Sequence, residues 1–266
     1  MASKPAVLVI TGHGLNCESE SRTAWEWAGA TVELVHLNDL LAGPAQLHRF
    51  QVLMFIGGFS FGDHMGSGLV MALRMRNAMA DDLLRFIGEG RLVMGVCNGF
   101  QVLVQMGLLP GLGGSYLSRR LALMQNDCGA FQNRWVELKC ESTSPCIFTR
   151  GIDRIALPVR HGEGKIFATD LTVLEAVEAS GGVACRYIDP GTGKPTQVFP
   201  WNPNGSQQAI AGLCDPTGRV FGMMPHPEAY LLAENHPTWE IDRHRLGNPM
   251  KGEGLRLFRN AVEYFA

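Results

Sequence analysis

The segment RLVMGVCNGFQVLVQMG, residues 91–107, most constrains what this chain can fold into. Its apolar start ends at Gly95, Cys97 stands between Gly95 and Gly99, and apolar residues at helical spacing follow directly. A strand that turns sharply into a helix around Gly-x-Cys-x-Gly is typical of a nucleophile elbow, which holds a reactive side chain above a sheet. We expect the two glycines to permit the strained backbone and to leave room for a substrate.

The position of Cys97 at the start of a helix favours its reactive form. The helix that begins at Asn98 directs its free amide groups and the positive end of its dipole toward the sulfur, and both favour thiolate over thiol. The chain has seven cysteines, and most free cysteines in proteins are buried and inert. The glycine-flanked setting after a strand nevertheless indicates that Cys97 is a nucleophile.

The composition is typical of a globular enzyme with a sizeable core. Of the 266 residues, 46% are hydrophobic and 18% are charged, and the formal net charge of −2 gives no electrostatic footprint for nucleic acid or an anionic membrane. The uncharged stretch 92–118 is not predicted to span a membrane, because polar residues, glycines and a proline interrupt it. The cysteines are irregularly spaced and the chain runs straight into a strand, so we expect a cytoplasmic protein without a signal peptide, a disulfide framework or a zinc ribbon.

Strand and helix patterns alternate through the first hundred residues. Strands are expected at 6–10, 31–37, 52–56 and 91–96. Helices are expected at 18–28, at 69–87 and from Asn98 to Gly107, with Asn38 or Asp39 capping a further short helix. This alternation predicts a parallel sheet with right-handed crossovers.

The remainder of the chain changes character. Strands are expected at 116–123, 135–139, 155–160, 183–188 and 219–224, with loop at 189–208 and a closing helix at 255–265. The sequence therefore predicts an α/β fold. We expect an open, mostly parallel sheet with helices on both faces and a small antiparallel extension, organised as one domain over residues 1–266.

A thiolate nucleophile needs a base and a group that orients the base. His226 directly follows the predicted last strand, so it belongs to the same carboxyl edge of the sheet as Cys97, where sites form in such folds. Glu228 lies two residues further on and faces the same way in an extended segment. A carboxylate there holds the imidazole in one tautomer. We therefore expect Cys97, His226 and Glu228 to act as a catalytic triad.

Two backbone amides are expected to form an oxyanion hole. One is the amide of Asn98, directly after the nucleophile. The other is the amide of Gly58, because Gly57 and Gly58 follow a predicted strand and let the backbone approach a substrate closely. The sequence shows no third glycine after Gly12-His13-Gly14 and no phosphate-binding Gly-x-x-x-x-Gly-Lys motif, so we expect no nucleotide site in this chain.

A second His-x-Glu pattern occurs at His161-Gly162-Glu163-Gly164. It is compatible with a rival base, a metal pair or a loop that binds substrate through its backbone. One His and one Glu are too few for a metal site, and no His-Glu-x-x-His motif is present, so no metal is expected.

Together these motifs resemble class I glutamine amidotransferases, which have a flavodoxin-like sheet. GVCNGFQ and PHPE carry the resemblance to the superfamily. GGFSFGDH, GVCNGFQ, GLLPG, HGEGK, NPNGS and MPHPE together resemble the family of glutaminase subunits of phosphoribosylformylglycinamidine synthase, and GVCNGFQ and NPNGS narrow the resemblance to it. The matching motifs are spread over nearly the whole chain.

The resemblance implies a role for each matching residue. Cys97 attacks the amide of glutamine, His226 transfers protons, Glu228 orients His226, and the amides of Gly58 and Asn98 hold the oxyanion. The remaining substrate-binding residues it implies are Gln101, His161 and Gly162. Ammonia then passes to a separate synthetase subunit, with or without a small third subunit. That synthetase binds ATP and magnesium and makes formylglycinamidine ribonucleotide in purine biosynthesis, so this chain itself needs no cofactor.

Three alternatives remain open from the residues. The first is a glutaminase subunit that serves another synthetase. The second is a Cys-dependent α/β-hydrolase of the dienelactone hydrolase kind, although its acid should precede its histidine by tens of residues. The third is a non-enzymatic module of the same fold. A further hypothesis is that residues 234–252 form a partner surface, so that their deletion spares the fold and weakens synthetase binding.

Overall fold

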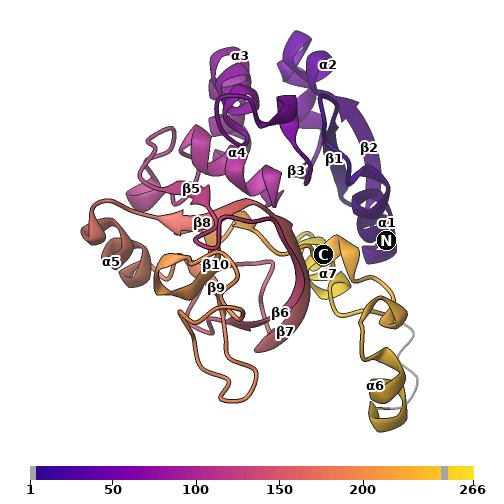
Figure 1. Cartoon of the computed structure of the whole chain (residues 1–266). Helices are drawn as coiled ribbons and strands as arrows, with labels where there is room; N and C mark the ends of the chain where they lie inside the picture. Colours follow the sequence, from indigo (N-terminus) through magenta and orange to yellow (C-terminus); the bar gives the residue numbers. More distant parts are fainter. Residues whose placement is uncertain (1–3, 247–250) are drawn as a thin grey trace.

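The computed structural model describes residues 4–246 and 251–266, and a nine-stranded sheet organises them (Figure 1). The strands follow the order β2-β1-β3-β4-β11-β10-β9-β6-β7. The first five in this order are parallel. These five are β2 (Thr31–His36), β1 (Ala6–Thr11), β3 (Val52–Phe55), β4 (Leu92–Val96) and β11 (Val220–Met223). Four of them come from the first hundred residues, as predicted.

The other four strands extend the sheet in antiparallel fashion. They are β10 (Ile210–Cys214), β9 (Val183–Tyr187), β6 (Gln132–Cys140) and β7 (Arg154–His161). A separate antiparallel pair joins β5 (Ala122–Gln125) to β8 (Glu163–Phe167). Because the nine-stranded sheet takes strands from both halves of the chain, it joins them in one layer. The organisation of residues 1–266 as one domain stays a prediction.

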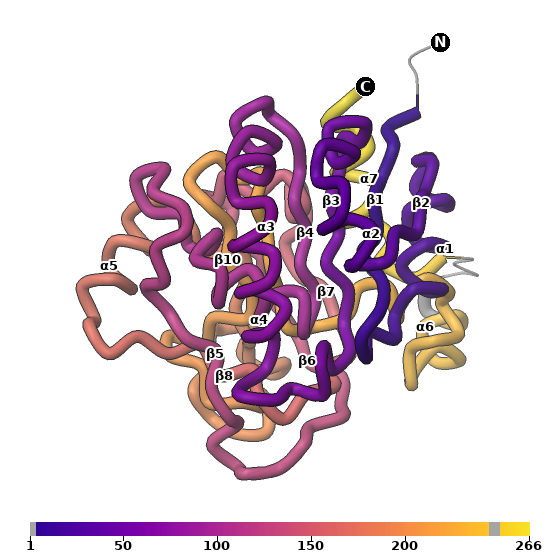
Figure 2. Tube along the Cα trace, turned by 90° about the horizontal axis from the view of Figure 1, so that it is seen from above, coloured from indigo at the N-terminus to yellow at the C-terminus, as the bar shows by residue number. Residues whose placement is uncertain are grey.

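Helices pack against both faces of the parallel strands. The helices of the described residues are α1 (Glu18–Ala28), α2 (Leu37–Ala42), α3 (Leu69–Gly88), α4 (Asn98–Met106), α5 (Leu171–Ala179), α6 (Trp239–Leu246) and α7 (Leu255–Glu263). Of these, α1, α2 and α4 contact the parallel strands directly. Helices α3 and α4 lie side by side (Figure 2), and α1 packs against α7. With this strand order, right-handed crossovers place α1 on one face and the α2–α4 group on the other. The α/β fold class is therefore confirmed.

The core lies between these helices and the sheet. The residues of β3 and β4 are all buried, as expected for strands covered on both faces. Trp25 of α1 meets Phe258 of α7 edge to face, with ring centroids 5.0 Å apart. Burying each such large apolar side chain contributes about 1.5–3 kcal/mol. No helix in the described part of the chain is long and apolar enough to cross a membrane.

Several sequence predictions about individual elements were wrong. Only Ala122 and Leu123 of the expected strand 116–123 belong to a strand, because the preceding residues form a loop with left-handed turns. His36, and not Asn38 or Asp39, caps α2, and its Nδ1 accepts a hydrogen bond from the Asn38 amide at 3.1 Å. Elements β8, β10, α5 and α6 were not predicted, and the closing helix ends at Glu263.

Candidate active site

Cys97 occupies a sharp turn between β4 and α4. Its backbone has φ 52° and ψ −109°, a conformation that side-chain-bearing residues rarely adopt. Such strain costs about 1–3 kcal/mol and persists only where the surroundings hold it. Here the Cys97 amide donates to the carbonyl of Met223 at 2.9 Å, which ties the turn to β11. The predicted strand-to-helix elbow is therefore present, with the strain on the cysteine itself.

The glycines on either side of Cys97 serve a different purpose from the one predicted. Neither Gly95 nor Gly99 has a left-handed backbone. A Cβ at Gly99 would collide with the carbonyl of Phe55, and one at Gly95 would lie 2.6 Å from the Leu103 side chain. Both glycines therefore let α4 pack tightly onto β3 and β4, which fixes where the helix begins.

His226 follows β11, which is the parallel neighbour of β4. Its amide donates to the carbonyl of Pro158 in β7 at 2.8 Å. Its Nδ1 lies 2.6 Å from Oε1 of Glu228, and the two side chains are only 4% and 1% exposed. Glu228 reaches the ring through a 3₁₀ turn, Pro227–Ala229, and not through the extended segment that was expected. With Nδ1 occupied, Nε2 is the nitrogen left to exchange protons.

The surroundings of His226 favour its charged form. Burial alone lowers its pKa, but the Glu228 carboxylate and the neighbouring thiols of Cys97 and Cys17 raise it well above the ordinary value. A Cβ at Gly57 would lie 2.9 Å from His226 Cε1, 3.1 Å from Cys17 Sγ and 3.6 Å from Cys97 Cβ. Because Gly57 has no side chain, the His226 ring, Cys17 and Cys97 can all pack around this position.

Cys17 is a site residue that the sequence analysis missed. It precedes α1, and burial raises the pKa of its thiol. Cys17, His226 and Glu228 offer ligand atoms within 4.8 Å of one another, the one such group in the described ranges. Nδ1 of His226 and Oε1 of Glu228 bond to each other, so this cluster already serves to orient the imidazole.

The amides of Gly58 and Asn98 are both available for an oxyanion. Neither donates a hydrogen bond to another residue in the described part of the chain. Gly58 has φ 138°, and a Cβ there would come within 2.7 Å of the Gly14 carbonyl and of Leu15 Cα. Only glycine fits this close approach, so the loop after β3 presents bare backbone beside Cys97.

Two cavities meet at Cys97. The Gln101 cavity is lined by Gln101, His161 and Gly162, together with Cys97 and Gly58. The His226 cavity contains His226 and Cys17 and shares Cys97 and Gly58 with the first. Every residue expected to bind substrate or to react, except the buried Glu228 and the Asn98 amide, therefore lines one of these two spaces. Glu228 and Asn98 adjoin them through His226 and Cys97.

His161 is neutral and oriented by an amide. Its Nδ1 lies 3.1 Å from Oδ1 of Asn126, whose Nδ2 donates to the His161 carbonyl at 2.8 Å. Burial, followed by the charge of His226, lowers the pKa of His161 to about 3. A general base needs a pKa near the working pH. Of the interpretations left open for this motif, the structure favours a substrate-binding loop.

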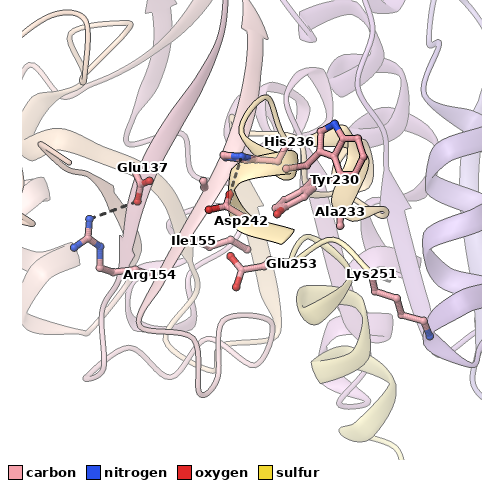
Figure 3. A pocket seen from close by; sticks show the side chains of 11 residues that line it. Glu137, Arg154, Ile155, Tyr230, Ala233, His236, Asp242, Lys251 and Glu253 are labelled. Carbon is pink, nitrogen blue, oxygen red and sulfur yellow. Dashed lines mark hydrogen bonds and ion pairs between the residues drawn. The ribbon is translucent and has the colours of Figure 1, made fainter. Parts of the chain in front are cut away.

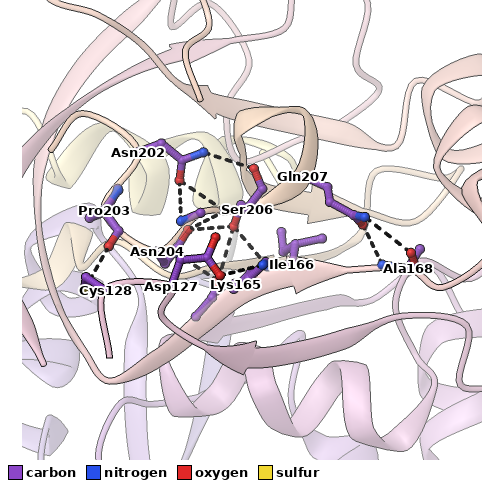
Figure 4. A network of polar contacts seen from close by, with 12 residues as sticks. Asp127, Cys128, Lys165, Ile166, Ala168, Asn202, Pro203, Asn204, Ser206 and Gln207 are labelled. Carbon is purple, nitrogen blue, oxygen red and sulfur yellow. Dashed lines mark hydrogen bonds and ion pairs between the residues drawn. The ribbon is translucent and has the colours of Figure 1, made fainter. Parts of the chain in front are cut away.

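A network of polar contacts holds that loop in place (Figure 4). In the NPNGS segment, Asn204 Nδ2 donates to the Gly164 carbonyl at 2.9 Å, and Ser206 Oγ accepts from the Ile166 amide at 3.0 Å. Lys165, which like Gly164 and Ile166 belongs to β8, forms an ion pair with Asp127 at 2.6 Å. The NPNGS loop thus positions β8, whose first residue, Glu163, borders the Gln101 cavity.

A further cavity lies away from Cys97, beneath the C-terminal segment (Figure 3). Its lining includes Tyr230, His236 and Asp242, and Arg154 pairs with Glu137 at 3.5 Å at one side of it. Trp135 packs edge to face on His236 with ring centroids 4.5 Å apart. Of the suggested partner surface 234–252, residues 247–250 lie outside the described residues.

Comparisons with known proteins agree with this geometry. A family model for the CobB/CobQ-like glutamine amidotransferase domain matches residues 4–265. Subunit PurQ of phosphoribosylformylglycinamidine synthase from Methanococcus maripaludis is 41% identical, over 98% of this chain and 97% of that protein. The PurQ subunit of Dehalococcoides mccartyi is 40% identical over 98% of each chain. The chain belongs to the PurQ family of glutamine amidotransferases.

A solved structure supports membership of the PurQ family. The structure of PurLQS from Thermotoga maritima contains a chain that is 29% identical, with a TM-score of 0.69 over 99% of this chain and 100% of that one. The family predicted from the sequence motifs is therefore confirmed. A hydrolase of the dienelactone hydrolase kind is ruled out as an alternative.

Proposed function

We propose that this chain is the glutaminase subunit of a phosphoribosylformylglycinamidine synthase and that Cys97, His226 and Glu228 form its triad. The observation that carries the proposal is the buried His226–Glu228 pair beside the strained Cys97 turn. The His226–Glu228 pair follows β11 and the Cys97 turn follows β4. These two strands are parallel neighbours and end at the same edge of the sheet. Family membership supports the activity, and this geometry supports the residue roles.

Attack on glutamine begins with proton transfer from Cys97 to Nε2 of His226. The thiolate attacks the side-chain amide carbon, and the amides of Gly58 and Asn98 receive the developing oxyanion. Each such donor is worth about a hundredfold to a thousandfold in rate. The C–N bond then breaks as His226 returns its proton to the leaving nitrogen, which departs as ammonia and leaves a glutamyl thioester.

Water hydrolyses the thioester and regenerates the thiol. His226 acts as base in this step and Glu228 again stabilises the imidazolium. Gln101, His161 and Gly162 bind the amino-acid end of glutamine in the Gln101 cavity, which all three border. Glutamate and ammonia are the two products, so the chain needs no cofactor for its own half of the reaction.

A synthetase subunit is the proposed recipient of the ammonia. The relatives' printed names describe a subunit of phosphoribosylformylglycinamidine synthase, and the Thermotoga maritima structure is titled PurLQS. We propose the same arrangement here, with a synthetase that binds ATP and magnesium, a small third subunit, and neither nucleic acid nor membrane as partner. Free cysteines throughout the chain fit a reducing cytoplasm.

Covalent labelling tests the proposed nucleophile. The full chain is treated with 6-diazo-5-oxo-L-norleucine, a glutamine analogue with an electrophilic carbon, and the labelled peptide is identified by mass spectrometry. We expect a single adduct on Cys97, lost in Cys97→Ala and retained in the control Cys128→Ala, which removes an exposed thiol. Labelling elsewhere contradicts the triad. Absence of labelling and of glutamine hydrolysis, even with the synthetase present, indicates a non-enzymatic module.

A further inference from the structure

The Gln101 cavity is lined by two carboxylates that have no role in the proposed mechanism. Asp63 follows the Gly57-Gly58 loop, and Glu163 is the first residue of β8. Neither forms an ion pair with a lysine, arginine or histidine in the described ranges. The His226 cavity, by contrast, includes neither of them. Asp63 and Glu163 therefore belong to the Gln101 side, while the carboxylate that borders the His226 cavity is Glu20.

Hydrogen bonds fix both carboxylates in the wall of the cavity. Oδ1 of Asp63 accepts from Nδ2 of Asn98 at 3.3 Å, and that amide also donates to Gln101 at 2.9 Å. Oε2 of Glu163 accepts from the Ser67 amide at 3.4 Å. The Glu163 carbonyl accepts from Nε2 of Gln101 at 2.6 Å. Gln101 thus links β8, which begins at Glu163, to Asn98 of α4, which holds Asp63.

Neither carboxylate forms an ion pair in the described ranges, although Arg160 borders the same cavity. Burial raises the pKa of Asp63, and the charge of Glu163 adds to this increase. Like charges that share a partly buried site disfavour each other. A cation bound between them would relieve this repulsion.

His161 borders the same cavity. Because Oδ1 of Asn126 is an acceptor, Nδ1 of His161 carries the proton and donates to it. Nε2 of the neutral ring therefore presents a lone pair, and it has no hydrogen-bond partner among the described residues although the side chain is buried. Two carboxylates and a neutral imidazole thus supply hydrogen-bond acceptors in the lining of this cavity.

We propose that Asp63 and Glu163 bind the α-ammonium group of the amino-acid substrate, which makes them specificity-determining residues. The inference rests on the proposed glutaminase function. The α-nitrogen of glutamine is four bonds from the carbon that Cys97 attacks, roughly 5 Å. Gln101, which is linked to both acids, lies one helical turn from Cys97, also about 5.4 Å along the axis. Arg160 borders the same cavity and supplies the positive charge that the α-carboxylate requires.

Two alkylating reagents separate this role from a structural one. The full chain reacts with 6-diazo-5-oxo-L-norleucine, which carries an α-ammonium group, or with iodoacetamide, which does not. For Glu163→Gln and Asp63→Asn, we expect the rate of Cys97 alkylation by the diazo reagent to fall about tenfold to a hundredfold, the range for a charge-assisted hydrogen bond. The iodoacetamide rate should stay at the wild-type value. Glu175→Gln, on the exposed face of α5, is the matched control and should change neither rate.

The remaining outcomes each decide a different point. Unchanged diazo rates in both acid variants overturn the ammonium subsite. Equal slowing of both reagents also overturns it, because the acids then only position Cys97. Protection of the wild-type chain by magnesium chloride would identify a metal site in place of an ammonium site. A wild-type chain that reacts with iodoacetamide but not with the diazo reagent contradicts the proposed glutaminase function instead.

Discussion

Nδ1 of His226 lies 2.6 Å from Oε1 of Glu228, and both residues are almost completely buried. A bond this short between a ring nitrogen and a carboxylate fixes the tautomer and orientation of the imidazole. The second carboxylate oxygen, Oε2, has no hydrogen-bond partner in the described part of the chain. The charge of Glu228 is therefore directed mainly at one ring, which explains why the pKa of His226 is raised despite burial.

Glu228→Gln should lower the turnover of glutamine without unfolding the protein. Glutamine keeps the size of the side chain but removes the charge that stabilises the imidazolium and selects its tautomer. We expect kcat for glutamine hydrolysis, measured with the synthetase present, to fall roughly a hundredfold to ten-thousandfold. Glu175→Gln, at an exposed position of α5 outside the segment 234–252, serves as the control and should retain activity. A Glu228→Gln protein with wild-type kcat would remove Glu228 from the triad.

The triad residues could be predicted because each lies in a short motif. Cys97 stands in a strand-turn-helix pattern, and His226 and Glu228 follow a strand within three residues of each other. Cys17 and Asp63 could not be found in this way. They reach the site only because the loops after β1 and β3 meet, where the Asn16 amide donates to the Gly57 carbonyl at 3.2 Å.

Acid should destabilise the protein partly through His161. Its folded pKa of about 3 is below the unfolded value near 6.5, so the unfolded chain gains a proton first as the pH falls. The stability that the neutral ring contributes is present above pH 6.5 and is lost as the pH falls from there toward 3. Each pH unit in this window costs about 1.4 kcal/mol of unfolding free energy.

The variant His161→Gln tests this dependence. Urea unfolding at pH 6.5 and pH 5 should give a smaller loss of unfolding free energy for the variant than for the wild type, by roughly 2 kcal/mol. His226 does not confound the comparison. Its pKa is raised, so its contribution is complete below pH 6.5 and declines only as the pH rises through the folded pKa. Equal losses in the two proteins would show that His161 takes up a proton in the folded state.

Gly99→Ala should destabilise the fold by overpacking. A Cβ at this position collides with the carbonyl of Phe55, which is backbone and cannot rotate away. We expect a loss of about 1–3 kcal/mol or more in the free energy of unfolding by urea. Gly88→Ala, at the end of α3, is the matched control because its Cβ meets nothing within 4 Å. Equal stability of the two variants would mean that α4 moves freely away from β3.

The parallel half of the fold could be predicted because its strands carry continuous apolar runs between amphipathic helices. Every residue of β3 and β4 is buried. The antiparallel half could not be delimited as well. Strand β8 alternates buried and half-buried residues over only five positions and contains glycine, so its pattern resembles a loop. Its position depends on side chains of the NPNGS segment, which lies about forty residues further along the chain.

Removal of residues 234–250 should spare the fold and weaken the complex with the synthetase. The Gly252 amide donates to the Leu231 carbonyl at 2.8 Å, so the residues that flank the deleted segment lie next to each other. Gly252 and Gly254 are kept, because Cβ atoms there would collide with the backbone of Tyr230 and of Pro227, next to Glu228. Within the segment, α6 exposes Ile241 to 61%, which is typical of a surface that a partner covers.

The deletion variant is compared with the wild type in two measurements. Urea unfolding should give similar midpoints, because α6 contributes little to the core. Titration with the synthetase should give a dissociation constant at least about tenfold higher, the effect of losing roughly 1.4 kcal/mol of contact. Ile241→Glu changes one exposed side chain and should reproduce part of this loss without any change in chain length. If both variants bind the synthetase as tightly as the wild type, the segment is not part of the interface.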